Sequence, residues 1–435
     1  MSPQRSSRPI SRRFSRYLEK LEPTLGHADR TAPFRAYVTG LLLPGDRKSV
    51  EPMAARVAPD RVRAMHQSMH HFVASSPWNA DALISKVREL VLPSIEEHGA
   101  ITSWIIDDTG MRKKGTHSVG VARQYCGQVG KQDNCQVAVS LSIANDFASL
   151  PIAYRLYLPR TWSDDRARCR AAGVPTTVRF ATKLEIALEQ LQAACTANVP
   201  RGVVVADAAY GNNTMFREQI AAMDLSYMLA VQSNTTLWRV GEEPLPPKPK
   251  TRRAKGRRRT ILQRRRGCVP VAVHDLAKEL APTAFSEITW REGTAGALRS
   301  RFAAVRVHAA HRDELRHEIR PQEWLLIEWT SDETEPRKYW LSNLPETASL
   351  TDLVTHAQRR WRIERDYQEL KDEIGLDHFE GRSWRGFHHH AALCIAAYGS
   401  LVAERGIFSP TDIRAALPQP ALPRDFQPRG TASAR

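Results

Sequence analysis

The sequence has no run of about eighteen consecutive apolar residues, so it predicts no membrane-spanning helix. Its six cysteines include no CxxC pair and have no paired cysteine–histidine spacing, which argues against a structural zinc site and against a disulfide framework. Acidic residues are also fewer than basic ones, with 47 Asp and Glu against 63 Lys and Arg in 435 residues. These shortages indicate a protein of a reducing, cytoplasmic compartment with a basic surface.

The formal net charge is +16 and the isoelectric point is near 9.8. Such an excess of one sign favours a polyanionic partner, with nucleic acid first and an anionic membrane surface second. Charged residues make up 25% of the chain and hydrophobic ones 42%, which excludes wholesale disorder. We therefore expect a folded protein that binds nucleic acid and has no membrane partner.

The N-terminal part of the chain predicts an arm followed by helices. Residues 1–16 are rich in Arg and Ser and contain no acid. They superficially resemble an organelle transit peptide, but we interpret them as a basic flexible arm. Residues 17–98 are typical of helices; Asn79, for example, is a good N-cap before a stripe of apolar residues from Leu83 to Val91. We predict a helical N-terminal DNA-binding domain here, although the pattern does not decide whether it contains a helix-turn-helix.

Residues 99–234 change to a mixed α/β pattern. Short apolar runs and period-two alternation predict strands, and two longer stretches predict helices. The predicted strands are 104–106, 137–143, 150–158, 203–206 and 227–231, with helices over 177–197 and around 215–220. This order is typical of one compact mixed sheet.

Residues 235–340 favour a β-rich insertion, with strands at 271–273, 303–307 and 324–329. Within it, residues 247–267 carry eleven basic residues and no acid, which predicts a basic loop. Residues 341–406 predict C-terminal helices, one long helix from Ser349 to Ile374 and a second over 384–404. We expect the Pro-rich segment 407–435 to be an irregular tail.

Acidic residues follow two of the apolar strands. Asp107 and Asp108 come after the strand 104–106, and Asp207 directly follows 203–206. An acid at the end of a buried strand is costly unless it enters a polar cleft or binds a cation, and Mg²⁺ prefers such oxygen ligands. The alternative is that these acids only cap helices or form turns.

The predicted long helix carries a further acid on a polar face. At about 100° per residue, Arg360, Glu364, Tyr367 and Lys371 fall within about 60° of one another. Apolar residues flank this face, so a helix docked on a sheet would direct Glu364 into a cleft. A solvated charge stripe is the alternative. Three acids from two strands and one helix, in a basic protein, favour two-metal phosphoryl transfer.

The combined motifs resemble the bacterial insertion-sequence DDE transposases, in the group with a Y-x2-R-x3-E-x6-K signature. The resemblance covers roughly residues 35–405. It is carried by WIIDDTGMRKKGTHSVGVARQY, by VVVADAAYGN and by WRIERDYQELKDEIGLDHFEGRSWRGFHHH. Arg360, Glu364 and Lys371 stand at the R, E and K places, whereas Ala357 replaces the Tyr, so one DNA-backbone contact of the family lacks its residue. The implied fold is α/β, an RNase H-like mixed-sheet catalytic core interrupted by a β-rich insertion, with a helical N-terminal domain.

The resemblance also implies how the acids would work. Asp107 or Asp108, Asp207 and Glu364 would be both catalytic residues and ligands of two Mg²⁺ ions, for which Mn²⁺ can substitute. Aligning the family's D-x-T motif selects Asp107, whereas aligning D-T selects Asp108, and both stay open. Arg360 and Lys371, with Tyr367 on the same face, would contact DNA phosphates, which position DNA without reading its sequence.

Other residues are weaker candidates for DNA contact. Trp340 could stack on a base as in relatives, although core packing is the favoured interpretation. Lys113 and Lys114 can contact DNA or solvent. The basic loop contributes Arg257, Arg258 and Arg259. The triplet 388–390 is histidine throughout, but three consecutive helical positions point in different directions, so we expect no metal there.

The sequence thus predicts a DNA transposase that binds the terminal inverted repeats of its element, cleaves them and joins them to target DNA. Its partner would be double-stranded DNA, element ends and target alike. The resemblance implies at least a homodimer when assembled on DNA, in the bacterial cytoplasm and at the nucleoid. Two alternatives stay open: an RNase H-like nuclease without strand transfer, and a catalytically inactive DNA-binding derivative.

Overall fold

The computed structural model describes residues 10–247, 260–293, 296–330 and 333–407. Arg257–Arg259, most of the basic loop and the Pro-rich tail lie outside these residues, as does the start of the predicted basic arm. In the described part, no helix has the length and apolar character needed to cross a membrane.

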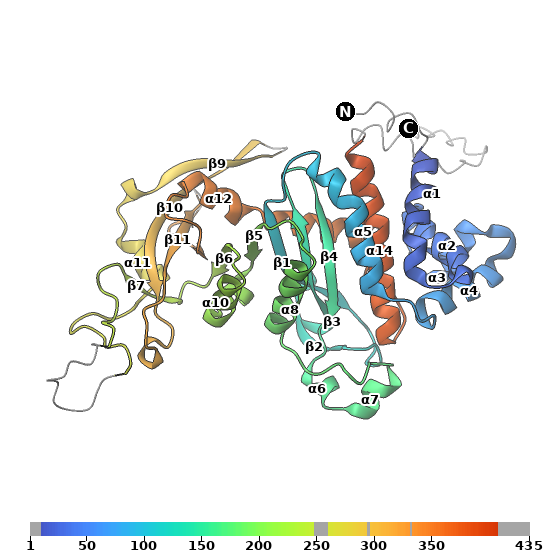
Figure 1. The fold of residues 1–435 in the computed structure, drawn as a ribbon, viewed down its shortest axis with the longest axis horizontal. Helices are drawn as coiled ribbons and strands as arrows, with labels where there is room; N and C mark the ends of the chain where they lie inside the picture. The colour runs from blue at the N-terminus through green and yellow to red at the C-terminus, as the bar shows by residue number, and fades with distance from the viewer. Residues whose placement is uncertain (1–9, 248–259, 294–295, 331–332, 408–435) are drawn as a thin grey trace, which may run out of the picture.

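In the described residues, twelve strands form one continuous mixed sheet, which Figure 1 shows running from the middle of the molecule into the insertion. The strands are β1 (Ser103–Arg112), β2 (Ala122–Cys126), β3 (Lys131–Ala144), β4 (Ser149–Leu156), β5 (Val203–Ala206), β6 (Tyr227–Val231), β7 (Thr236–Arg239), β8 (Val271–Ala272), β9 (Ser286–Gly293), β10 (Gly296–Ala309), β11 (Gln322–Trp329) and β12 (Lys338–Ser342). The sheet order is β2-β3-β1-β5-β6-β12-β11-β10-β7-β8, with β4 beside β3 and β9 beside β10.

The core of this sheet combines antiparallel and parallel pairs. Strand β3 pairs antiparallel with both β1 and β4, whereas β5 pairs parallel with β1 and with β6. β5 is buried throughout and reads Val-Val-Val-Ala, as expected for a strand covered on both faces. The carboxyl ends of β5 and β6 therefore lie at the same edge.

The helices are distributed over the whole chain. The α-helices are α1 (Ile10–Leu21), α2 (Thr31–Leu42), α3 (Val50–Val57), α4 (Val62–Ala74), α5 (Ala80–Glu96), α6 (Arg160–Ser163), α7 (Arg166–Ala171), α8 (Lys183–Thr196), α9 (Ala208–Gly211), α10 (Thr214–Ala222), α11 (Val273–Glu279), α12 (Leu350–Gln358), α13 (Trp361–Gln368) and α14 (Trp384–Arg405). A π-helical turn, η7 (Glu369–Glu373), follows α13 directly. Short 3₁₀ turns are η1 (Glu22–Leu25), η2 (Ala28–Arg30), η3 (Pro59–Arg61), η4 (Gly127–Val129), η5 (Pro282–Ala284) and η6 (Asp313–Leu315).

The two faces of the core sheet are covered by different helices. Ser140 of β3 bonds Tyr367 of α13, and Tyr154, its partner on β4, stacks on Phe387 of α14. On the opposite face, Asp108 of β1 pairs with Lys183 of α8. Because side chains of a strand alternate between faces, α13 and α14 lie on one side and α8 on the other. The acids of β1 are therefore sandwiched between helices.

The N-terminal helices share their hydrophobic core with the sheet. Figure 1 shows α14 standing between α5 and the helices α1 to α4, and one cluster of buried side chains runs from Leu18 to Val402. The helical prediction for 17–98 is confirmed. The prediction that residues 1–16 form a flexible arm is wrong for 10–16, because α1 begins at Ile10 and Arg13 pairs with Glu404 of α14 at 2.6 Å.

The predicted single helix from Ser349 to Ile374 is also wrong. α12 ends at Gln358, and the chain turns at Arg359 and Arg360 through 3₁₀-type bonds before α13 begins. Arg359 anchors the turn by pairing with Asp146 at 2.8 Å. The π-helical turn then ends the run, closed by a bond from the Ile374 N–H to the Glu369 carbonyl. Of the site candidates in this segment, Glu364 and Tyr367 therefore lie on the short helix α13, Arg360 is its N-cap and Lys371 lies in η7.

The insertion is built on the β6–β12 pair. β12 pairs antiparallel with β6, so the insertion leaves the core through one strand and returns through its neighbour. Its strands bury two further apolar clusters, one around Leu325 and Ile327 and one around Phe302 and Trp340. The insertion strands extend the core sheet and add a core of their own.

Candidate active site

Three aspartates converge where β1 passes the end of β5. One carboxylate oxygen from each of Asp107, Asp108 and Asp207 lies within 4.8 Å of the others. In the described part of the chain, this is the one group of three or more His, Cys, Asp or Glu side chains close enough to share an ion. The sequence placed Asp107 and Asp108 at a strand end; β1 instead runs on to Arg112, because it pairs with β3 along its whole length.

Strand register explains why Asp107 meets Asp207. Ile105 pairs with Val205 in the parallel β1–β5 pair, so Asp107 and Asp207 occupy equivalent positions two residues further on. Asp207 is also the N-cap of α9, and its Oδ1 accepts a hydrogen bond from the Ala209 N–H at 2.9 Å. Asp207 therefore both caps a helix and belongs to the aspartate cluster, which are the two alternatives that the sequence left open for it.

The two neighbouring aspartates of β1 face different helices. Asp107 pairs in register with Ser140, on the α13 face, and its Oδ2 lies 3.3 Å from an Arg360 guanidinium nitrogen. Asp108 faces α8 and pairs with Lys183. Asp107 therefore shares its side of the sheet with the helix that carries Glu364, and Asp108 does not.

Burial strongly disfavours the charge on the aspartates next to α13. Burial raises the pKa of Asp107 to about 7, against the opposing effect of Arg360 and with further repulsion from Asp108 and Asp207. The pKa of Asp207 is also raised by burial, and next by the negative charge of Asp108. A cation at this point would relieve both the burial cost and the repulsion.

Two members of the predicted polar face, Tyr367 of α13 and Lys371 of η7, lie against strands β3 and β1. Tyr367 bonds Ser140, and the Lys371 amino group donates to the Gly110 carbonyl at 3.0 Å. Arg360 links the aspartate cluster to Glu364, because its guanidinium group contacts Asp107 at 3.3 Å and Glu364 at 2.8 Å. Burial lowers the pKa of Lys371 and raises that of Tyr367.

Glu364 itself stands apart from the aspartate cluster. Its side chain is 62% exposed and its recorded ion pair is with Arg360. The structure therefore brings three of the four predicted acids together and connects the fourth to them through one arginine.

The remaining candidates for DNA contact are placed differently from one another. Lys114 is exposed, whereas Lys113 is half-buried and donates to the Phe379 carbonyl at 2.6 Å. Trp340 is only 8% exposed and packs with Phe302 in the insertion core, in line with the packing interpretation. A ring so enclosed cannot stack on a base without leaving its cluster, so the structure gives no support to Trp340 as a DNA contact.

Two residues near the aspartates were missed in the sequence. Lys183 pairs with Asp108, which lies 75 residues away in the sequence, and no local sequence pattern predicts such a contact. Tyr210 is 1% exposed, and its hydroxyl finds no hydrogen-bond partner among the described residues. Burial raises its pKa, and the charges of all three aspartates raise it further. Its position in α9, three residues after Asp207, was the available signal. The histidines 388–390 lie on α14 and bond backbone carbonyl or N–H groups, and none of them belongs to the aspartate group.

The donor set suits a divalent cation with a preference for oxygen ligands. Mg²⁺ is usually held by one or two carboxylates together with waters and phosphate oxygens. Asp107 and Asp207 offer carboxylates at equivalent register positions, and Asp108 offers a third within 4.8 Å. The residues present therefore fit a divalent metal site.

Known proteins resemble this chain in sequence and in structure. The family described as DDE superfamily endonuclease matches residues 20–297. A curated relative, "Probable transposase for insertion sequence element IS701" of Microchaete diplosiphon, is 31% identical over 189 residues. That match spans 43% of this chain and 45% of the relative. A solved structure, "Cryo-EM structure of piggyBac transposase synaptic complex with hairpin DNA (SNHP)", superposes over 92% of this chain and 74% of that one, with a TM-score of 0.40 and 9% identity.

Proposed function

The chain belongs to the DDE superfamily of endonucleases, and we propose that it is the transposase of an insertion sequence. It would bind the terminal inverted repeats of its element, cleave phosphodiester bonds there and join the ends to target DNA. The observation that carries this proposal is the cluster of three aspartates on β1 and after β5, within 4.8 Å of one another. The similarity to an insertion-sequence transposase supports it.

We assign the first acid to Asp107. It occupies the position equivalent to Asp207 on the neighbouring strand and faces α13, the helix of Glu364. Asp108 faces α8 and is engaged by Lys183, so its role would be to hold that helix and to add negative charge beside the site. The assignment predicts that Asp107→Asn is inactive and that Asp108→Asn keeps measurable cleavage.

Glu364 is the third acid of the proposal. Its ion pair with Arg360 holds the carboxylate toward the side of β1 that carries Asp107. Because Arg360 contacts both acids, it screens their mutual repulsion while the site is free of cations. DNA phosphate would compete for the same guanidinium group, which would release both carboxylates for metal binding.

Asp107, Asp207 and Glu364 would hold divalent ions, Mg²⁺ with Mn²⁺ as a substitute. When bound, the metal supplies activation of the attacking oxygen and stabilisation of charge on the leaving oxygen. The chain's own cations orient the DNA: Arg360 stands between the acids, and Lys371 is tied to β1 next to them. Both would contact phosphates flanking the scissile bond.

We further propose that the core is RNase H-like. Three strands, β4, β3 and β1, pair antiparallel, and β5 and β6 continue the sheet in parallel beside β1. The acids stand on β1 and at the end of β5, with the third on a helix packed across the sheet. The partners would be the double-stranded element ends and target DNA, bound by at least a homodimer at the bacterial nucleoid.

The decisive experiment is a strand-transfer assay with the full chain, Mg²⁺, a target plasmid and duplexes bearing the repeats that flank the coding region. Joined products are expected. Cut ends without joining would instead identify a nuclease, and binding without cutting would identify an inactive derivative.

The third acid is tested in the same assay with Glu364→Gln, which keeps size and hydrogen bonding but removes the charge. Cleavage and joining should fall by at least about a thousandfold, or about 4 kcal/mol of transition-state stabilisation, while binding to the ends persists. Glu373→Gln is the matched control, since Glu373 is an exposed acid nine residues further along the same segment. Glu369 is a poorer control because it is paired with Arg405. Normal cleavage by Glu364→Gln would refute the assignment.

A further inference from the structure

A polar pocket opens beside the aspartates, at the same edge of the sheet. Its volume is about 200 Å³, and its walls come from the segment after α9, from the end of β6 with the start of β7, and from the end of β10. The polar side chains around it are those of Asn212, Thr214, Arg217, Gln232, Asn234, Thr235, Thr236 and His311. These side chains are hydroxyls, carboxamides, one guanidinium and one imidazole, with no carboxylate among them.

The pocket is held close to Asp207 by the single turn α9. Asp207 caps this turn at its start and Asn212 ends it, so the two lie about 8 Å apart along the helix. The turn docks on the end of β6 because Gly211 has no side chain; a Cβ there would lie 1.9 Å from the Ala230 carbonyl oxygen. The Gln232 N–H then donates to Asn212 Oδ1 at 2.7 Å and fixes the pocket wall.

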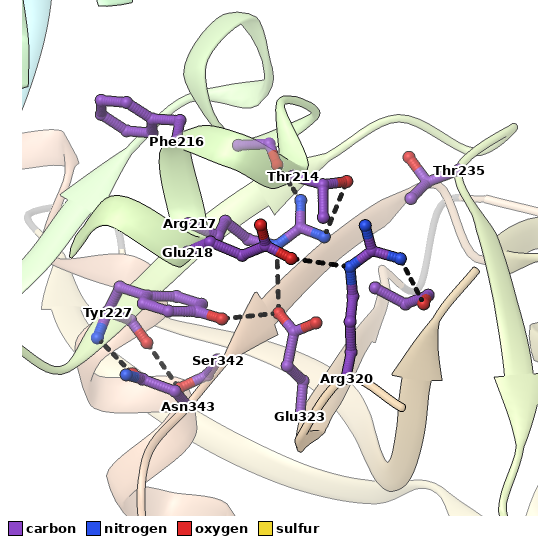
Figure 2. A network of polar contacts seen from close by, with 12 residues as sticks. Thr214, Phe216, Arg217, Glu218, Tyr227, Thr235, Arg320, Glu323, Ser342 and Asn343 are labelled. Carbon is purple, nitrogen blue, oxygen red and sulfur yellow. Dashed lines mark hydrogen bonds and ion pairs between the residues drawn. The ribbon is translucent and has the colours of Figure 1, made fainter. Parts of the chain in front are cut away.

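Arg217 and Thr214 of the pocket wall also belong to a buried ion network, which Figure 2 shows. Arg217 is 2% exposed and reaches Glu323 at 3.0 Å, the Gly211 carbonyl and Thr214. Glu323 also accepts a hydrogen bond from the Tyr227 hydroxyl at 2.8 Å. The network thus joins α10 of the core to β11 of the insertion and holds Arg217 rigidly in the pocket wall.

The recorded ion pairs of this network leave positive charge in excess. Arg316 and Arg320 both pair with one acid, Glu218, at 2.8 and 2.9 Å, while Arg217 pairs with Glu323. In the described part of the chain these three arginines therefore share two glutamates. Within the same described ranges, the buried Nε of Arg316 also has no hydrogen-bond acceptor. The unbalanced charge is that of Arg316 and Arg320, which share Glu218, the neighbour of Arg217 in α10. An anion in the pocket would be attracted by this excess, because opposite charges attract.

We propose that this pocket binds one backbone phosphate of the DNA strand, within about three nucleotides of the scissile bond, at about 3.4 Å of axial rise per nucleotide. The inference rests on the proposed function and adds a second anchoring point to it. The three arginines with their two glutamates supply a net positive charge. The hydroxyls and amides at the rim of the pocket, which includes Asn234 and Thr236, donate hydrogen bonds to the phosphate oxygens. The lack of carboxylates in the wall favours an anion over a metal ion.

The test replaces the rim without disturbing the network behind it. Asn234→Ala with Thr236→Val removes an amide and a hydroxyl, both on exposed side chains. Gln192→Ala with Thr196→Val is the matched control, since these exposed residues lie on α8, a helix away from the pocket. DNA binding by the full chain is measured by fluorescence anisotropy on end duplexes with one neutral methylphosphonate at each position in turn.

In the wild type and the control, one methylphosphonate near the scissile bond should weaken binding by about tenfold. The rim variant should bind unmodified DNA about tenfold more weakly and be insensitive to that same substitution. If every methylphosphonate has the same effect in the rim variant as in the wild type, or has none in either, the phosphate site is refuted. If the rim variant is instead insensitive to an abasic substitution, the pocket holds a base and the proposal is again wrong. A wild type that neither binds nor cleaves the ends would contradict the proposed function itself.

Discussion

Replacing Asp107 by Asn should stabilise the fold and abolish activity at once. Its carboxylate is buried beside Asp108 and Asp207, and burial raises its pKa from 3.8 to about 7. A carboxyl group whose pKa is higher in the folded state than in the unfolded state binds a proton more tightly when folded. Folding therefore loses stability as pH rises from about 4 to about 7, and the full penalty is present above pH 7.

The size of the effect follows from the pKa difference. About three pKa units at 1.36 kcal/mol each give a penalty of about 4 kcal/mol at pH 8, and about 2 kcal/mol at pH 5. Asparagine carries no charge, so the variant is free of this penalty at both pH values. Arg360 loses one of its two acids in the variant but keeps Glu364, so the figure of 4 kcal/mol is an upper bound.

The assay is thermal unfolding in EDTA, with the wild type and Asp107→Asn compared at pH 8 and pH 5. The melting temperature of the variant should exceed that of the wild type by several degrees at pH 8, and by about half as much at pH 5. Added Mg²⁺ should raise the melting temperature of the wild type, because a ligand stabilises the state that binds it, and leave the variant unchanged.

Asp108→Asn is the control, since it removes the neighbouring acid but leaves Lys183 without its partner. We expect no comparable gain of stability from it at pH 8. The reasoning fails if Asp107→Asn melts below the wild type at pH 8, or if its advantage is as large at pH 5 as at pH 8.

Three further outcomes are expected. Cleavage of end duplexes should require Mg²⁺ or Mn²⁺, and Ca²⁺ should support binding without cleavage because its looser coordination misplaces the attacking oxygen; full activity in EDTA would exclude the metal site. Arg217→Met should lower the free energy of unfolding by about 3 to 5 kcal/mol in urea titrations, because it leaves Glu323 buried without its partner; a loss under 1 kcal/mol would show that the network contributes little. Replacing Arg257, Arg258 and Arg259 by Ala should weaken DNA binding and reduce its salt dependence by up to about three counterions; an unchanged salt slope would remove the basic loop from the interface.

The sequence predicted the core of the sheet well because its strands have simple patterns. Alternation marked β3, and continuous apolar runs marked β5 and β6. The same local view ended β1 at Ile106, since two aspartates interrupt the apolar run. The strand continues because its hydrogen bonds with β3 hold it, and pairing with a strand so distant in the sequence leaves no pattern in the short segment itself.

The helix of Glu364 shows a second limit. A constant 100° per residue placed Lys371 on the face of Arg360, and Lys371 does contact β1 there. The prediction of one continuous helix was nevertheless wrong in the middle and in the last turn, because Arg359 pairs with Asp146 and the last turn is π-helical. Helix periodicity indicates which residues face the sheet. It carries no information on breaks in the helix, because these depend on tertiary contacts with residues distant in the sequence. The resemblance to DDE transposases, by contrast, is confirmed by the family match, since it rested on several separate motifs.

The pairing of β6 with β12 bears on how such a protein can change over evolutionary time. Seen from the core, the whole insertion is the loop of one antiparallel hairpin, leaving at Val231 and returning at Tyr339. Loop closure depends only weakly on length, about 0.6 kcal/mol for each doubling. Material can therefore be added to or removed from this loop in steps without altering the register of the strands that carry Asp107 and Asp207. Relatives that share the aspartates are expected to differ most in length at this point of the chain.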